Sequence, residues 1–193
     1  MLTAVFAVLI SSCKSERQKQ WETSKLSERL FEHNERGWKS NQLLNYSNDI
    51  QYRATEVPIE YYLLKNLGTS NVEKFDSIVE GSSQERIIEF EFEHIRGADL
   101  LTQEFTNKAY AKGVEYLSSK IQSDYQLVTQ SGDTISCNGV LFERHFNLSP
   151  FKRLMLYFSG VTPGEPVKLI YNDQLFNKTQ FEFDFNNNVQ AQL

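Results

Sequence analysis

Apolar residues recur at helical spacing in the N-terminal third of the chain. Leu26 and Leu30 lie four residues apart between residues 21 and 46, and charged side chains occupy the other faces of that segment. Two shorter apolar patterns follow, each with a residue type that favours a helix start and a glycine that ends it. We therefore expect residues 21–80 to be helical, in three segments: 21–46, Pro58–Gly68 and Ser70–Gly81.

The spacing of apolar residues changes from helical to alternating after Gly81. Residues 88–94 place Phe90 and Phe92 on one side and three glutamates on the other, which is the pattern of a half-buried strand. A further helix is expected over Asn107–Lys120. Turn-forming residues then separate five strand-like runs: Tyr125–Thr129, Thr134–Phe146, Arg153–Phe158, Val167–Tyr171 and Gln180–Phe185.

This order of elements predicts an α+β fold, with N-terminal helices packed on a mostly antiparallel β-sheet or sandwich. We expect one domain over residues 21–193, helical over 21–80 and mainly β over 84–186, because this length suits one ordinary domain. Fourteen phenylalanines and nine tyrosines provide the apolar area for a sizeable core.

Charge is distributed unevenly along the chain, whose formal net charge is −5. From Lys14 to Arg53 there are eight basic and six acidic residues, a balance of +2, and the remainder has twelve basic and nineteen acidic, a balance of −7. Such an acidic body with scattered basic residues argues against nucleic-acid binding, which needs clustered lysine and arginine. It would suit an inhibitor or immunity-type protein that blocks a basic partner.

The candidate chemistry is a set of carboxylates that alternate with phenylalanine in two strands: Glu89, Glu91, Glu93, Glu182 and Asp184. On neighbouring strands they would share one face, where they could bind calcium or act as general acid and base. The same alternation is typical of a strand with one solvated face. We favour this second interpretation, in which the five carboxylates form a solvated acidic surface. Each of the two strands would then pair with a different neighbour, and Lys152, Arg153 and Lys168 would supply opposite charges across the sheet.

Recognisable catalytic and metal-binding motifs are absent from the sequence. His33, His94 and His145 form no H-x-x-x-H or H-E-x-x-H pair, and there is no nucleophile elbow, P-loop or calcium loop. No catalytic residue, metal or cofactor is therefore predicted. The alternative is a hydrolase, which requires several residues to converge in one pocket: Glu89, Glu91, Glu93, His94 and Glu143.

The first thirteen residues have the pattern of a membrane-targeting segment. An apolar run from Leu2 to Ile10 leads into Ser11, Ser12 and Cys13, and the segment Ile10–Cys13 resembles the lipobox of bacterial lipoproteins. The resemblance implies cleavage before the cysteine, diacylglycerol on its thiol and an acyl chain such as palmitate on its new amine. The other interpretation of this run is a buried core segment, because it is too short to cross a bilayer.

On the lipoprotein interpretation, residues 1–12 are a signal segment and residues 13–20 are the acylated Cys13 with a polar tether. Its acyl chains would exceed the two signals that stable membrane attachment requires. Lys14 rather than aspartate follows the cysteine, which favours the outer membrane under the sorting rule for such lipoproteins.

Cys137 is the second of two cysteines, and it has no partner for an intrachain disulfide if Cys13 is acylated. Its strand-like surroundings predict a buried thiol that packs as a small hydrophobe, because no neighbouring base marks it as a nucleophile. The sequence therefore favours a membrane-anchored envelope lipoprotein with a non-enzymatic binding or structural role. Its expected partners are the membrane, through Cys13, and an envelope protein.

Overall fold

The computed structural model describes residues 20–67, 72–144 and 149–185, so the predicted signal segment and Cys13 lie outside the described residues. The chain has an α+β fold with antiparallel sheets, as the sequence predicts. It divides into two compact units, and each unit is built from two separate stretches of sequence. Among the described residues, no helix combines the length and apolar character that crossing a membrane would require.

The first unit contains residues up to Trp38 together with Pro58–Ser82. Its helices cover residues 20–35, α2 (Ile59–Leu67) and α3 (Val72–Gly81). Leu26, Leu64 and Phe75, one from each helix, form a buried apolar cluster, and Tyr61 of α2 is buried as well.

A single arginine joins the three helices of this unit. Arg29 Nε donates to Glu60 Oε1 of α2 at 2.5 Å, and its Nη1 donates to Asp76 Oδ1 of α3 at 2.8 Å. His33 Nε2 lies 3.1 Å from the other carboxylate oxygen of Glu60. These polar contacts supplement the apolar cluster of Leu26, Leu64 and Phe75.

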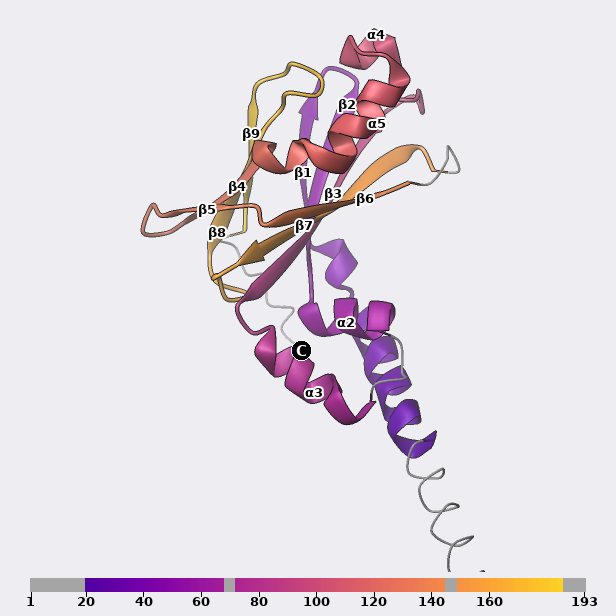
Figure 1. Ribbon diagram of the computed structural model, residues 1–193, viewed down its shortest axis with the longest axis vertical. Coiled ribbons are helices and arrows are strands. Elements are labelled where there is room, and N and C mark those ends of the chain that lie inside the picture. Colours follow the sequence, from indigo (N-terminus) through magenta and orange to yellow (C-terminus); the bar gives the residue numbers. More distant parts are fainter. Residues whose placement is uncertain (1–19, 68–71, 145–148, 186–193) are drawn as a thin grey trace, which may run out of the picture. The chain divides into compact units, whose positions relative to one another are not determined.

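The second unit, Lys39–Val57 with the residues from Ser83 onward, contains two antiparallel sheets (Figure 1). The five-stranded sheet has the order β1 (Gln42–Ser47), β2 (Ile50–Val57), β3 (Glu85–His94), β7 (Phe151–Ser159) and β6 (Gly139–Glu143). The four-stranded sheet has the order β5 (Thr134–Ser136), β4 (Tyr125–Thr129), β8 (Val167–Asn172) and β9 (Gln180–Asp184).

Aromatic rings from the two sheets pack together as the core of a β-sandwich. Phe90 of β3 meets Tyr125 and Tyr171 at centroid distances of 5.1 Å and Phe183 at 5.4 Å. Tyr52 of β2 lies 4.4 Å from Phe181 of β9. These rings bury a large apolar area in edge and offset contacts, which aromatic pairs favour.

Short helices close one part of this sandwich: α4 (Gln103–Thr106), α5 (Tyr110–Ser119) and the 3₁₀ helix η3 (Ile121–Asp124). Leu117 of α5 and Ile121 of η3 are fully buried in the shared core. This packing fixes the path of the chain from α5 through η3 into β4, and that path forms the candidate site.

The predicted helix over residues 21–46 is wrong beyond residue 35. Gly37 has a φ of 65°, which is typical of the residue that ends a helix, and its N–H bonds to the carbonyl of Asn34. Residues 42–57 then form the β1–β2 hairpin, so the region predicted as helical contains two strands of the sandwich.

The predicted single strand Thr134–Phe146 is also wrong, because its two halves belong to different sheets. β5 pairs with β4 in the four-stranded sheet, whereas β6 pairs with β7 in the five-stranded sheet. Cys137 and Asn138 lie at the crossing point, and the Asn138 N–H donates to the carbonyl of Tyr157. The apolar pattern continues through this crossing, which is why the sequence resembles one strand.

Candidate functional site

The glutamates predicted as an acidic surface are neutralised by arginines on neighbouring strands. Glu91 is only 4% exposed, and it lies directly opposite Arg53 of β2 and Arg153 of β7 in the strand register. Arg53 Nη1 donates to Glu91 Oε2 at 2.5 Å, and Arg153 Nε donates to Glu91 Oε1 at 2.8 Å. We call this trio the Arg–Glu–Arg ladder.

Further carboxylates extend the ladder without forming a free acid–base pair. Glu89 and Glu143 lie 3.4 and 3.3 Å from Arg153, and Glu93 lies 3.9 Å from Arg53. Burial raises the pKa of Glu89, although the charge of Arg153 opposes the shift. The hydrolase hypothesis placed these groups in a pocket, but the structure engages them in ion pairs across a sheet.

The remaining predicted carboxylates belong to the other sheet. Glu182 and Asp184 lie on β9, which pairs with β8 and not with β3. Lys168 Nζ lies 2.8 Å from Glu182 Oε2, as the predicted charge pairing requires, whereas Lys152 pairs instead with Asp99 at 3.0 Å. The five carboxylates therefore form two separate sets.

His94 does not join the glutamates of its own strand. It is buried and its ring centroid lies 5.1 Å from that of Phe105, while its Nδ1 accepts the backbone N–H of Ala98. His145 lies outside the described residues. Within the described ranges, no group of three or more His, Cys, Asp or Glu side chains is arranged to hold a metal ion.

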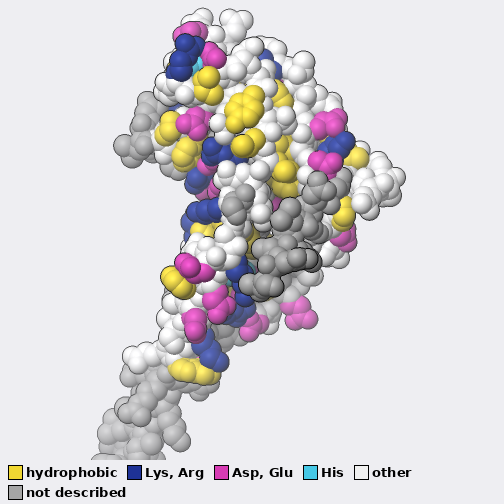
Figure 2. Space-filling view, turned by 180° about the vertical axis from the view of Figure 1, so that it is seen from behind, with side chains coloured by type: hydrophobic (Ala, Val, Ile, Leu, Met, Phe, Trp, Pro, Cys, Tyr) yellow, Lys and Arg dark blue, Asp and Glu magenta, His cyan; other side chains and the backbone are white. Residues whose placement is uncertain are grey.

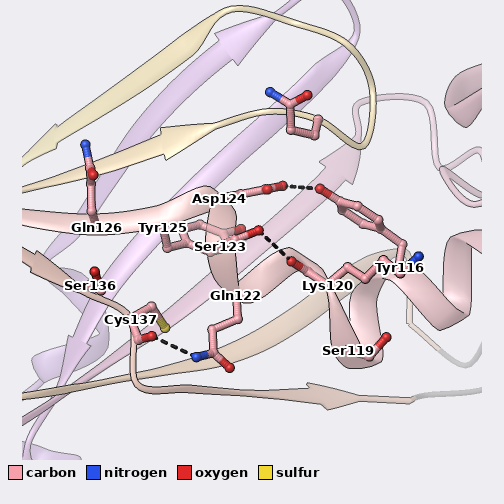
Figure 3. Close-up of a pocket in the computed structure, with 11 residues that line it drawn as sticks. Tyr116, Ser119, Lys120, Gln122, Ser123, Asp124, Tyr125, Gln126, Ser136 and Cys137 are labelled. Carbon is pink, nitrogen blue, oxygen red and sulfur yellow. Dashed lines mark hydrogen bonds between the residues drawn. The ribbon is translucent and has the colours of Figure 1, made fainter.

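An open groove of about 880 Å³ lies where α5, η3, β4 and β5 meet (Figure 3). Hydroxyl, amide and charged side chains dominate its lining: Tyr116, Ser119, Lys120, Gln122, Ser123, Asp124, Gln126, Ser136 and Gln174, with Tyr125 and Cys137. The chain turns after α5 through η3, and the Cys137 N–H bonds to the carbonyl of Tyr125. These two constraints hold the sides of the groove in place.

A buried carboxyl group and a phenol form a close pair in this groove. Tyr116 Oη donates to Asp124 Oδ2 at 2.6 Å, and Figure 3 shows the two side chains pointing toward one another from α5 and η3. Burial raises the pKa of Asp124 to about 6, against hydrogen bonds from Tyr116 and the backbone of Gln174 that lower it. Burial and the bond to Asp124 also raise the pKa of Tyr116.

Cys137 is buried, which confirms the sequence prediction. Its Sγ lies 3.1 Å from the carbonyl of Gly139 and 3.5 Å from that of Tyr157, and burial raises the pKa of the thiol. Gln122 Nε2 donates to the Cys137 carbonyl at 2.9 Å (Figure 3). Because the thiolate is the reactive form, these surroundings disfavour Cys137 as a nucleophile.

The sequence analysis missed the groove, since its residues have no shared motif. One signal was present in the sequence. Asp124 lies three residues after the apolar Ile121 and immediately before the strand Tyr125–Thr129, so its carboxyl group lies between two buried segments. Its pairing with Tyr116 depends on the turn between α5 and β4, which residue spacing alone does not specify.

Comparisons of this chain with family models and curated proteins found no match. A similar solved structure is that of a novel protein of unknown function from Burkholderia pseudomallei K96243. The two chains are 11% identical with a TM-score of 0.38, over 92% of this chain and 90% of the other.

Proposed function

We propose that this protein is a membrane-anchored envelope lipoprotein that binds a polar ligand in the groove without chemical conversion. The groove is the main support for a binding role, because its lining presents amide and hydroxyl groups from several elements. Such groups orient a polar ligand through hydrogen bonds, and this is how small-molecule sites obtain specificity. A segment of an envelope protein is the second class of ligand for the same groove.

The anchor rests on the sequence around Cys13. Acylation there would hold the folded units at a membrane surface, and the lysine at position 14 favours the outer membrane. The sorting rule and the lipobox resemblance support this part of the proposal independently of the groove.

A binding role is favoured over catalysis by the state of the reactive groups. The Cys137 thiol has a raised pKa, and the glutamates of β3 are engaged by Arg53 and Arg153. The same ion pairs weaken the hypothesis of an acidic inhibitor, since they neutralise much of the predicted acidic surface. Asp124 keeps the hydrolase alternative open, because a carboxyl with a pKa of about 6 suits general acid–base work.

The anchor is tested by the intact mass of the protein purified from membranes of its host, beside a Cys13→Ala variant. We expect a chain that starts at Cys13 and carries acyl mass, and a variant that is released or kept as precursor. An unmodified chain that retains residues 1–12 would contradict the anchor.

The binding role is tested by native mass spectrometry of the same preparation. We expect a bound species on the wild-type chain and its loss in Ser136→Trp, which fills the groove, while Gln103→Trp on the exposed surface of α4 keeps it. The mass of the bound species distinguishes a small molecule from a protein segment. Equal occupancy in both variants, or no bound species on any chain, would contradict binding in this groove.

The hydrolase alternative is tested with a panel of nitrophenyl esters and glycosides. We expect no turnover above that of buffer for the wild type or for Asp124→Asn. Turnover that Asp124→Asn abolishes would replace the binding proposal with an enzymatic one.

A further inference from the structure

Trp21 presents its ring to solvent near the start of the described helix 20–35. It is 58% exposed, and Lys25 Nζ lies 3.7 Å from its ring centroid one helical turn further on. The buried residue Leu26 and its neighbour Leu30 lie about 140–180° around the helix from Trp21, at 100° per residue. The Trp21–Lys25 pair therefore faces away from the small core of its unit.

The pair lies close in sequence to the proposed attachment point. Trp21 is the eighth residue after Cys13, and that length of chain spans at most about 28 Å even when fully extended. A lipid-attached Cys13 would therefore keep Trp21 within less than one bilayer thickness of the membrane surface, which is about 40–45 Å with its headgroups.

We propose that Trp21 and Lys25 contact the headgroup region of the membrane that holds Cys13, a proposal that rests on the lipid anchor proposed above. Tryptophan favours this region because its ring is apolar and its N–H is polar. Lysine near an anionic surface adds electrostatic attraction. From Lys14 to Arg29 there are five basic and three acidic residues, a balance of +2, which complements anionic lipids.

Acidic residues limit the contact to the first turns of the described helix. Glu28 and Glu32 fall on the same face as Trp21, about 10 and 16 Å further along the axis. Figure 2 shows hydrophobic side chains interspersed with charged ones on the face that it presents, so an isolated exposed ring is not unusual by itself. The distance to Cys13 and the adjoining lysine distinguish Trp21 from the others.

Tryptophan fluorescence tests this contact, because the chain has only two tryptophans and Trp38 is 8% exposed. The full acylated protein is placed in vesicles of phosphatidylethanolamine and phosphatidylglycerol, with or without bromine on the acyl chains near the headgroups. We expect quenching of the Trp21 signal by about twofold, taken as the difference between wild type and Trp21→Phe. The signal of Trp21→Phe, which reports Trp38, should change little.

A charge variant separates lipid contact from simple proximity. Lys25→Gln should reduce the quenching in anionic vesicles, whereas Lys65→Gln on the exposed surface of α2 should not. An acylated chain whose Trp21 is not quenched would overturn the contact and leave the anchor standing. A chain without acyl mass would overturn both proposals, so the mass of each preparation is measured alongside.

Discussion

Glu91 and Asp124 are equally buried carboxyl groups in different surroundings. Each is 4% exposed, yet Glu91 lies between two guanidinium groups while Asp124 meets a neutral phenol. The two arginines supply opposite charge from both neighbouring strands, and this compensates for desolvation of the carboxylate. Burial raises the pKa of Asp124 to about 6, because the hydrogen bonds that it accepts lower the pKa too little to offset the desolvation, and no salt bridge to it is found among the described residues.

The number of acidic residues in a strand is therefore a poor guide to its chemistry. The glutamates of β3 form the most conspicuous acidic pattern in the sequence, and the fold uses them to join three strands. Asp124 stands outside any such pattern, yet its pKa of about 6 lets its charge change near neutral pH. The counter-charge, rather than burial, separates a structural carboxylate from a candidate functional one.

Removing an arginine from the ladder should produce the largest effect. Arg153→Met would leave Glu91 with Arg53 and would remove the ion pairs that Arg153 forms with Glu89 and Glu143, so we expect the free energy of unfolding to fall by about 3 kcal/mol. Urea denaturation followed by circular dichroism would measure the change.

An exposed ion pair provides the control for this variant. Lys168→Met breaks the pair with Glu182 on the solvated face of β8 and β9, and we expect the urea midpoint to stay unchanged within error. Equal shifts of the urea midpoint in the two variants would show that the Arg–Glu–Arg ladder contributes no more to stability than an exposed ion pair, so Glu91 would not be a structural carboxylate.

The groove pair should give a smaller and pH-dependent effect. Tyr116→Phe removes the hydroxyl that donates to Asp124, and we expect a loss of about 1.5 kcal/mol at pH 7.5, where the carboxylate is charged. At pH 4.5, where Asp124 is protonated, the loss should shrink. Urea denaturation at both pH values measures it, and a loss that is the same at both would contradict the charged hydrogen bond.

Local residue patterns predicted much of the fold. The alternation in Ile88–His94 predicted β3, and Pro58 and Gly81 marked the ends of segments that became α2 and α3. These signals are strong because strand alternation and helix ends depend on nearby residues alone. The antiparallel sheet class followed from the short strands and their turns.

Features that depend on distant residues were missed or misjudged. The β1–β2 hairpin was assigned to a helix, although Asn48 has a φ of 54° in a two-residue turn with Asp49, a known hairpin signal. The burial of Glu91 requires arginines from β2 and β7, which are far apart in sequence. The groove requires the crossing of the chain between sheets at Cys137, which the continuous apolar pattern concealed.

Asp124→Asn should remove the pH dependence that the groove carboxyl imposes on the free energy of unfolding. The folded state binds the Asp124 proton more tightly than the unfolded state, because the pKa rises from 3.8 to about 6. Its stabilising contribution is therefore full below pH 3.8 and is lost as the pH rises through about 6. Relative to the variant, the wild type should lose about 1–2 kcal/mol between pH 4 and pH 7, after allowance for solvent screening.

Urea denaturation of the wild type and Asp124→Asn across this range provides the measurement. Glu182→Gln on β9 provides the control, because the hydrogen bond from Lys168 lowers the pKa of Glu182 and its removal should leave the pH dependence near pH 6 unchanged. Parallel curves for the wild type and Asp124→Asn would mean that Asp124 titrates normally, which would also weaken the hydrolase alternative.

The smallest effect is expected at Cys137, and it bears on whether the groove is a binding or a reactive site. In a Cys13→Ser variant Cys137 is the only thiol, and its burial and raised pKa predict that iodoacetamide at pH 8 modifies the folded protein at least about tenfold more slowly than the chain in urea. Intact mass at successive times measures both rates. Since Gln122 and Cys137 share a hydrogen bond at the groove wall, Gln122→Ala should accelerate alkylation only if the wall opens to solvent. Alkylation of the folded protein at the unfolded rate would mean that the thiol reaches the groove as a competent nucleophile. That outcome would favour a reactive, catalytic groove over an inert binding groove.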